Sequence, residues 1–401
     1  MNLLKLKIFL LCLISTATFA QTANRYESEI FTSYQLKSNI QYGRAATVSG
    51  SLMDLMLDIY TGAGDTVKTR PLVIFIHGGG FKDGDKLSNF GTLVCGGLAK
   101  RGYVVASINY RLGTSNTLKT DYEAMIRAVQ DGKAAVRFFR RYSALYGVDT
   151  SQIFVTGSSA GSITALHMAY LRENEIPTYA NLTSLGGTLE GTSGNAGYSS
   201  KIQGVISNWG ALVDYKYIKT GDVPLFCVHG LSDVTVPCDS SFADGPFHYG
   251  SIIIYNYAKS LGIKTGIRLF ANTGHTLDNS SAKQDSAYKD FSAWLFSILK
   301  QTTAIKTEGN LSQPGSPILK QNYPNPFNPA TTIEYQIPTA GLVQLNIYDI
   351  SGKLVNRVVN NYQNAGLHKL SFDGSLLCSG IYYARLTMSS YSVIQKMILL
   401  K

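Results

Sequence analysis

The pentapeptide Gly157-Ser158-Ser159-Ala160-Gly161 constrains this chain more than any other stretch, because it separates a β-branched apolar run from a helical one. Residues 152–156 predict the end of a strand, and a helical pattern covers residues 162–172. A Gly-x-Ser-x-Gly segment in that position predicts a sharp strand-to-helix turn that holds the central serine clear of the sheet. The pattern alone is weak, because the same residue types form ordinary loops. Ser159 is therefore a candidate nucleophile whose partners must be found elsewhere in the chain.

The N-terminal twenty residues have the pattern of a secretory signal peptide. Lys5 and Lys7 precede an apolar run at residues 8–14, and small residues lead up to Ala20. We expect residues 1–20 to be removed on export. No apolar run in the chain reaches the roughly 20 residues that a helix needs to cross a bilayer, so we expect no transmembrane segment in the mature protein.

Length and composition predict a globular protein of two or three domains. The chain has 401 residues, of which 45% are hydrophobic and 15% charged. The formal net charge is +10, but the Lys and Arg residues are spread along the chain without a dense cluster, so we expect no nucleic-acid partner. The cysteines form no Cys-x-x-Cys pair and have no histidine at metal-ligand spacing, so we also expect no metal site.

Four cysteines follow the predicted signal peptide: Cys95, Cys227, Cys238 and Cys378. Cys227 and Cys238 flank one short loop, and export to an oxidising compartment makes them candidates for a disulfide. Free buried thiols are the alternative, most of all for Cys95 and Cys378. The sequence leaves this choice open.

Strands and helices alternate through residues 21–300, which predicts a mostly parallel sheet with helices on both faces. Strands are expected at residues 30–42, 53–60, 72–76, 103–109, 152–156, 202–209, 224–229 and 266–271, and helices at residues 88–100, 122–146, 162–172, 250–261 and 286–300. The first two strands alternate and predict an antiparallel pair, whereas residues 72–76 are continuously apolar and predict a strand buried on both faces. Residues 173–201 interrupt the pattern as an inserted loop, and loops of this length are usually functional or mobile.

The segment His77-Gly78-Gly79-Gly80-Phe81 follows the buried run at residues 72–76. Together with the pentapeptide around Ser159, it resembles the α/β-hydrolase fold, and more narrowly the esterase and lipase branch with a His-Gly-Gly-Gly oxyanion loop. The resemblance covers roughly residues 41–300. It implies an acyl-enzyme mechanism that uses a serine, a histidine and an acid and needs no cofactor.

The chemistry of ester cleavage requires donors for the negative charge that develops on the carbonyl oxygen. Losing one backbone donor typically costs about 2.7–4 kcal/mol in the barrier. In the family the donors come from the glycine loop and from the residue after the nucleophile, which here are Gly79, Gly80 and Ala160. We expect His77 to shape the loop through hydrogen bonds to the backbone rather than to act as the base.

The fold predicts the chain order serine, acid, histidine. His275 lies in the loop after the strand at residues 266–271 and is the candidate base. Asp233 follows the strand at residues 224–229 and is the candidate acid, with Asp214, after the preceding strand, as the alternative. The other histidines fit this position less well: His77, His167, His229, His248 and His368.

The last quarter of the chain has a different character. Residues 301–320 are rich in Thr, Ser, Gly and Pro and predict a linker. Residues 321–401 predict a small β-sandwich. Its six short strands are expected at residues 332–336, 341–348, 353–359, 368–372, 380–387 and 391–400.

The segment Asn-Tyr-Pro-Asn-Pro-Phe-Asn-Pro at residues 322–329 opens this region, and a Lys-containing strand at residues 395–401 ends it. Together they resemble the C-terminal sorting domain of the type IX secretion pathway, and this resemblance implies an immunoglobulin-like sandwich. The resemblance implies the type IX machinery as a partner and a location outside the cell, either secreted or attached to the outer surface. Whether the domain is then cleaved stays open, and a carbohydrate-binding or spacer sandwich is the alternative.

These patterns predict a secreted serine hydrolase of the carboxylesterase or lipase type, which cleaves carboxylic esters. The alternatives are a carbohydrate esterase acting on acetyl xylan or feruloyl esters, a serine peptidase of the same fold, and a non-catalytic surface adhesion module. The peptidase is disfavoured because no large domain precedes the oxyanion loop, and the adhesion module because competent residues fill every catalytic position. Acyl and alcohol specificity, which we expect residues 173–201 to influence, and oligomeric state stay open.

Overall fold

A computed structural model describes residues 25–241, 248–306, 317–350, 352–388 and 391–401. The predicted signal peptide at residues 1–20 lies outside these residues. The chain divides into two compact units, the first extending to Ser297 and the second from Ile298 to Lys401.

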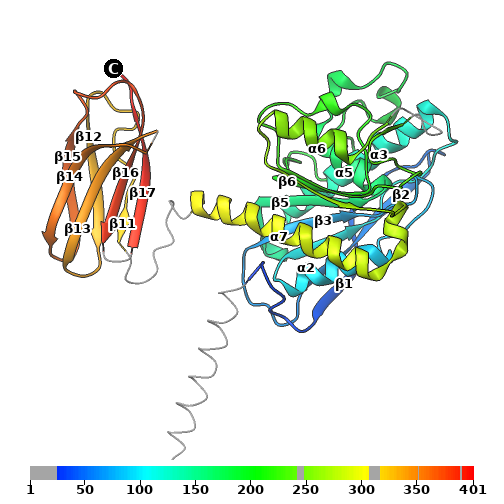
Figure 1. The fold of residues 1–401 in the computed structure, drawn as a ribbon, viewed down its shortest axis with the longest axis horizontal. Helices are drawn as coiled ribbons and strands as arrows, with labels where there is room; N and C mark the ends of the chain where they lie inside the picture. Colours follow the sequence, from blue (N-terminus) through cyan, green and yellow to red (C-terminus); the bar gives the residue numbers. More distant parts are fainter. Residues whose placement is uncertain (1–24, 242–247, 307–316, 351, 389–390) are drawn as a thin grey trace, which may run out of the picture. The chain divides into compact units, whose positions relative to one another are not determined.

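The first unit is built on an eight-stranded sheet with the strand order β1-β2-β4-β3-β5-β6-β7-β10 (Figure 1). The strands are β1 (Tyr34–Ala46), β2 (Leu52–Gly62), β3 (Arg70–Ile76), β4 (Val104–Ile108), β5 (Val148–Ser158), β6 (Gly204–Asn208), β7 (Leu225–Gly230) and β10 (Thr265–Phe270). β2 runs antiparallel to both β1 and β4, and every neighbouring pair from β4 to β10 is parallel. The predicted α/β fold class is confirmed. A two-stranded sheet of β8 (Ser240–Ser241) and β9 (His248–Tyr249) was not predicted.

Helices cover both faces of this sheet, with α3, α5 and α6 on one face and α2 and α7 on the other (Figure 1). The helices are α2 (Asn89–Lys100), α3 (Leu118–Arg141), α4 (Ser143–Tyr146), α5 (Ala160–Tyr170), α6 (Ser251–Ser260) and α7 (Ser281–Lys306). The helix predicted at residues 122–146 begins earlier, because the Thr117 hydroxyl caps α3 by accepting from the Thr120 amide. Among the described residues, no helix is both long and apolar enough to cross a bilayer.

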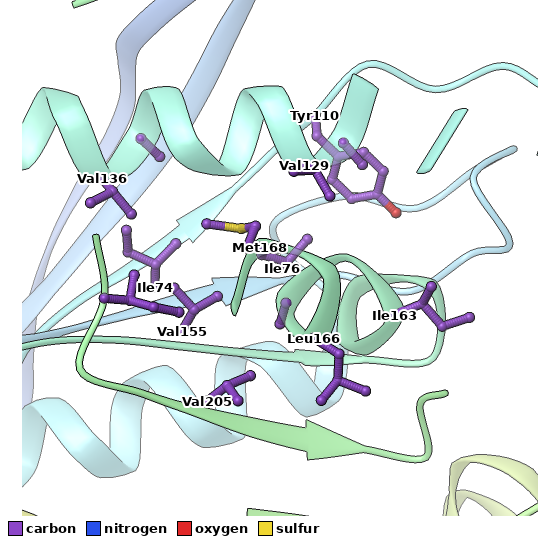
Figure 2. Close-up of a cluster of buried hydrophobic side chains, with 14 of the residues drawn as sticks. Ile74, Ile76, Tyr110, Val129, Val136, Val155, Ile163, Leu166, Met168 and Val205 are labelled. Carbon is purple, nitrogen blue, oxygen red and sulfur yellow. The ribbon is translucent and has the colours of Figure 1, made fainter. Parts of the chain in front are cut away.

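The core between the sheet and α3 and α5 is aliphatic (Figure 2). Ile74, Ile76 and Val155 come from the central strands, and Val129 and Leu166 from the two helices; all five are fully buried. Burying a side chain of this size contributes about 1.5–3 kcal/mol relative to leaving it exposed. The central strands β3 and β5 are therefore held firmly, and so are the loops that leave their carboxyl ends.

A buried ion pair fixes the segment that follows β4. The Arg111 guanidinium donates to both oxygens of Asp131 on α3, with an Nη2–Oδ1 distance of 2.8 Å, and the Arg111 amide donates to Oδ2 at 2.8 Å. The Ser193 hydroxyl donates to Asp131 Oδ1 at 2.6 Å, so this carboxylate also anchors residues 173–201. All three residues are buried.

We predict that Asp131→Asn lowers the free energy of unfolding by about 3–5 kcal/mol, because it leaves the Arg111 charge buried without its partner. Urea unfolding of the full chain measures the change. Asp54→Asn is the matched control, since Asp54 pairs with Arg44 at 3.2 Å while both side chains are more than half exposed. The control should change stability little. Equal losses in the two variants would contradict the role given to the buried pair.

The second unit is a β-sandwich of two antiparallel sheets. One sheet holds β11 (Ile318–Leu319), β12 (Ala330–Ile337) and β15 (Gly366–Asp373), and the other holds β14 (Leu354–Gln363), β13 (Gly341–Asp349), β16 (Gly380–Met388) and β17 (Tyr391–Leu399). Alternate residues of β12, β13 and β16 are buried and form its core. All six predicted strands are present.

The predicted linker at residues 301–320 is shorter in the structure at both ends. α7 continues to Lys306 because residues 301–306 contain no glycine or proline to stop it. β11, at Ile318–Leu319, pairs with β12 and already belongs to the sandwich. Two residues are too few to give a strand pattern in the sequence.

Candidate active site

The strand order of the first unit gathers four loops at the carboxyl edge of the parallel sheet. They follow β3, β5, β7 and β10, the strands that precede the His77 loop, Ser159, Asp233 and His275. Ligands of open α/β sheets bind at this edge, because the loops after parallel strands all leave the sheet there.

Ser159 lies in the sharp turn between β5 and α5. Its backbone has φ 52° and ψ −122°, a conformation that a non-glycine residue adopts only when its surroundings impose it. A Cβ at Gly161 would lie 2.0 Å from the Ile76 carbonyl oxygen, so only glycine lets α5 start against β3. Ser159 is partly exposed, whereas both of its neighbours are buried. The predicted strand-to-helix turn is present.

Asn208, at the end of β6, holds this turn from the other side. Its carbonyl oxygen accepts from the Ser159 amide at 3.0 Å, and its side-chain amide donates to the Gly157 carbonyl oxygen at 2.7 Å. The Ser162 hydroxyl lies 2.6 Å from the Gly157 carbonyl oxygen and 2.7 Å from the Asn208 amide nitrogen. We did not single out Asn208 from the sequence, where it is one of several polar residues at a strand end.

The structure brings Ser159, His275 and Asp233 together in a hydrogen-bonded chain. His275 Nδ1 lies 2.7 Å from Asp233 Oδ2, and His275 Nε2 lies 2.9 Å from Ser159 Oγ. Since an ionised carboxylate only accepts, Nδ1 donates to it and the unprotonated Nε2 accepts from the serine hydroxyl. This is the geometry in which an imidazole can remove a proton from a serine.

Asp233 is buried and surrounded by donors. Its Oδ1 accepts from the amides of Thr235 and Val236, each at 2.9 Å. Burial alone would raise the pKa of this carboxyl, but hydrogen bonds from His229, His275 and the Val236 amide outweigh it and hold the pKa well below its usual range. The carboxylate is therefore ionised at neutral pH and can stabilise a positive charge on His275.

The alternative acid, Asp214, is placed differently. It caps a short 3-10 helix, Tyr215–Tyr217, where its side chain accepts from the Lys216 amide at 2.9 Å. No hydrogen bond of the described residues joins Asp214 to His275. Asp233 is the carboxylate that the geometry places on the imidazole.

His77 contacts the backbone of its own loop, as the sequence predicted. Its Nδ1 lies 2.6 Å from the Gly78 carbonyl oxygen and donates to it, and its ring stacks on Tyr110 with 4.4 Å between the ring centroids. Burial lowers the pKa of His77, so the ring stays neutral.

The three predicted oxyanion donors have free amides. Across the described part of the chain, the backbone N–H groups of Gly79, Gly80 and Ala160 are in no hydrogen bond. Gly80 and Ala160 line the same cavity as Ser159, and Gly79, with φ 115°, accepts from the Lys82 amide through its carbonyl oxygen. Unengaged amides beside a serine are what a developing oxyanion requires.

A cavity of about 280 Å³ opens beside Ser159. Apolar side chains form part of its lining: Phe81, Met125, Ile163, Val213 and Val236. Polar side chains line the rest: Lys82, Asn116, Asp121, Tyr122, Thr235 and His248. The site therefore offers both apolar surface and hydrogen-bonding groups to a substrate.

None of the described lining residues comes from residues 173–201, so the expectation that this segment shapes the pocket is not supported. The segment packs on α3 instead. The Gln130 side-chain amide donates to the carbonyl oxygens of Leu185 and Thr188, and Glu190 pairs with Lys133 at 2.8 Å. The sequence shows the lack of periodicity in this segment but not the contacts that anchor it.

Cys227 and Cys238 do not form a disulfide. All four cysteines of the described residues are free, and three of them are buried: Cys95, Cys227 and Cys238. Burial raises the pKa of the Cys227 thiol to about 12, so it is neither a thiolate nor a nucleophile at neutral pH.

His167 lies inside α5, below the serine, and is fully buried. Its Nδ1 donates to the Ile163 carbonyl oxygen at 2.7 Å, and burial lowers its pKa to about 4. In an unfolded chain the pKa of histidine is about 6.5. Between these values the unfolded state binds a proton that the folded state does not, so folding stability falls as the pH drops through this window.

We predict that the wild type loses roughly 2–3 kcal/mol through His167 between pH 7.5 and pH 4.5. His167→Asn can keep the donor to Ile163 but does not titrate, so its loss over the same range should be smaller by that amount. Urea unfolding of both proteins at the two pH values measures the difference. Identical losses would show that His167 is protonated as readily in the folded protein as in the unfolded chain.

Comparison with known proteins gives two family matches. Residues 57–213 match the family BD-FAE, and residues 321–400 match the secretion system C-terminal sorting domain. Both resemblances drawn from the sequence motifs, an esterase-type α/β-hydrolase and a type IX sorting domain, are thereby confirmed.

Among curated proteins, the chain is 34% identical over 99 residues to the esterase LipI of Mycobacterium tuberculosis, covering 25% of this chain and 28% of that protein. It is 32% identical over 123 residues to a probable isoprenylcysteine alpha-carbonyl methylesterase of Oryza sativa, covering 30% and 27%. A neuroligin-like protein of Caenorhabditis elegans is 33% identical over 102 residues, covering 25% and 13%. The matches thus span less than a third of each relative.

Among solved structures, a truncated carbohydrate esterase from gut microbiota aligns with a TM-score of 0.50 at 19% identity, covering 66% of this chain and 96% of that one. Esterase 2 of Thermogutta terrifontis aligns with a TM-score of 0.49 at 22% identity, covering 66% and 94%. At 19% identity, the likeness to the carbohydrate esterase shows the fold alone.

Proposed function

We propose that this protein is a secreted serine hydrolase that cleaves carboxylic esters through an acyl-enzyme. The observation that carries the proposal is the hydrogen-bonded chain from Asp233 through His275 to Ser159, next to unengaged amides. Several curated relatives are named esterases, which supports the same reaction class.

In the proposed mechanism, Ser159 Oγ attacks the ester carbonyl carbon while His275 Nε2 removes the hydroxyl proton. Asp233 keeps the imidazole in the correct tautomer and stabilises the imidazolium without taking its proton. The amides of Gly79, Gly80 and Ala160 donate to the oxyanion. When the tetrahedral intermediate collapses, His275 returns the proton to the departing alcohol, and a water activated by His275 then releases the acid.

The size and lining of the cavity favour short or hydroxylated groups over long lipid chains. Its volume of about 280 Å³ lies just below the range of about 300–1,000 Å³ that small-molecule pockets occupy. Asn116, Asp121 and His248 supply hydrogen-bonding groups that an alkyl chain would leave unsatisfied. A carbohydrate ester, such as an acetyl group on a polysaccharide, is therefore the second candidate substrate, ahead of a lipid.

We predict that the full chain hydrolyses p-nitrophenyl butyrate faster than p-nitrophenyl laurate, because the cavity is small and partly polar. Ser159→Ala should lower kcat by at least about a thousandfold, since it removes the nucleophile. Initial rates at pH 8 measure both effects, with acetylated xylan and an aminoacyl nitroanilide as parallel substrates.

Ester hydrolysis at the wild-type level in Ser159→Ala would contradict the assignment of Ser159 as the nucleophile. Cleavage of the nitroanilide without cleavage of any ester would favour the peptidase, and no turnover of any substrate would favour the adhesion module. Matching circular dichroism spectra of the two proteins show that the substitution leaves the fold intact.

We further propose that the sandwich at residues 321–401 directs the protein to the type IX secretion machinery, which places it outside the cell. The match of residues 321–400 to a C-terminal sorting domain supports this role. Secretion would give the esterase access to large or insoluble substrates.

Deleting residues 321–401 should leave the protein in the periplasm of a bacterium that has a type IX system, because the machinery then has no domain to bind. Immunoblots of the periplasm, outer surface and medium measure the distribution. Full-length Ser159→Ala is the control, and it should leave the cell like the wild type. Unchanged export of the deleted chain would contradict the sorting role.

A further inference from the structure

His229 is a second histidine on the carboxylate of Asp233. It is the penultimate residue of β7 and is fully buried. Its Nε2 lies 2.7 Å from the Val236 carbonyl oxygen and 3.3 Å from Asp233 Oδ2. Asp233 Oδ2 therefore lies between two imidazoles, His275 on the side of the serine and His229 on the side of the sheet.

The partners of His229 determine where its proton lies. Both groups that face Nε2 are acceptors, so Nε2 carries the proton. Nδ1 lies 2.8 Å from the hydroxyl of Ser251, the first residue of α6. Because Nε2 carries the proton, Nδ1 accepts from this hydroxyl. Both ring nitrogens of His229 therefore have a hydrogen-bond partner.

His229 also closes the loop that carries the acid. The chain leaves β7 at Gly230 and folds around the Asp233 carboxylate, which the amides of Thr235 and Val236 hold from inside the loop. The bond from His229 to the Val236 carbonyl oxygen joins the two ends of this loop. The His229 side chain thus holds both the loop and Asp233 Oδ2, the oxygen that accepts the hydrogen bond from His275 Nδ1.

We propose that His229 is a positioning residue for the reaction: its Nε2–H holds the Asp233 loop so that Oδ2 stays in line with His275 Nδ1. This inference rests on the proposed function, because Asp233 matters for catalysis only if Ser159 and His275 act as described. A displacement of about 1 Å in such a constellation can cost roughly a hundredfold in rate.

Two substitutions of His229 separate positioning from packing. The side-chain amide of His229→Gln can reach the place of Nε2 and keep a donor there, whereas the amide of His229→Asn reaches only the place of Nδ1. We expect kcat for p-nitrophenyl butyrate to stay within about threefold of wild type in the Gln variant and to fall at least about tenfold in the Asn variant. The loss should lie mainly in kcat, since His229 does not line the cavity.

Rates are compared per folded protein, with circular dichroism and Tm recorded for the full-length wild type and both variants. Equal kcat in the two variants, whether both are active or both impaired, would overturn the proposal, because a purely packing role does not depend on the Nε2 donor. If the Asn variant does not fold, the Gln variant decides: kcat within threefold of wild type supports the proposal and a tenfold loss overturns it. An inactive wild type would instead refute the proposed function itself.

Discussion

The hydrogen bond between Asp233 and His275 is the interaction on which the site depends. It joins the loop after β7 to the loop after β10, and it fixes the tautomer that lets His275 accept from Ser159. Parallel pairing of β7 with β10 places the two loops side by side, and backbone hydrogen bonds from Leu231 to Phe270 and from Ser232 to Thr273 connect them. The sheet therefore positions Asp233 and His275 before any substrate binds, which is the preorganisation that the proposed mechanism requires.

The strained backbone of Ser159 depends on the same sheet. Its φ of 52° is maintained because α5 packs directly on β3 at Gly161 and because Asn208 of β6 holds the turn through main-chain and side-chain bonds. The cost of such strain is of the order of 1–3 kcal/mol, which the buried aliphatic core around Ile74 and Val155 offsets. The packing that stabilises the sheet thus also holds Ser159 in the conformation that leaves it partly exposed.

The sequence predicted the strands of the large sheet, the longer strands of the sandwich and the main helices, but not β8, β9 or β11. It singled out Ser159, His275 and Asp233 from motifs and from the chain order of the family that it resembles. It did not single out Asn208 or His229. Asn208 matters because β6 pairs with β5, and His229 matters because the chain folds back towards it after β7. Neither arrangement can be read from the residues that flank these two in the sequence. Residues 173–201 were expected to influence specificity because loops of this length are usually functional, but their contacts with α3 depend on tertiary packing.

In the proposed mechanism, Ser159 is a nucleophile activated by His275. Intact-protein and peptide mass spectrometry after treatment with a fluorophosphonate tests it most directly, because this reagent phosphonylates only activated serines. We expect one adduct per chain, on the peptide that contains Ser159, and much slower labelling in His275→Ala. No adduct on the wild type, or an adduct on a different residue, would contradict it.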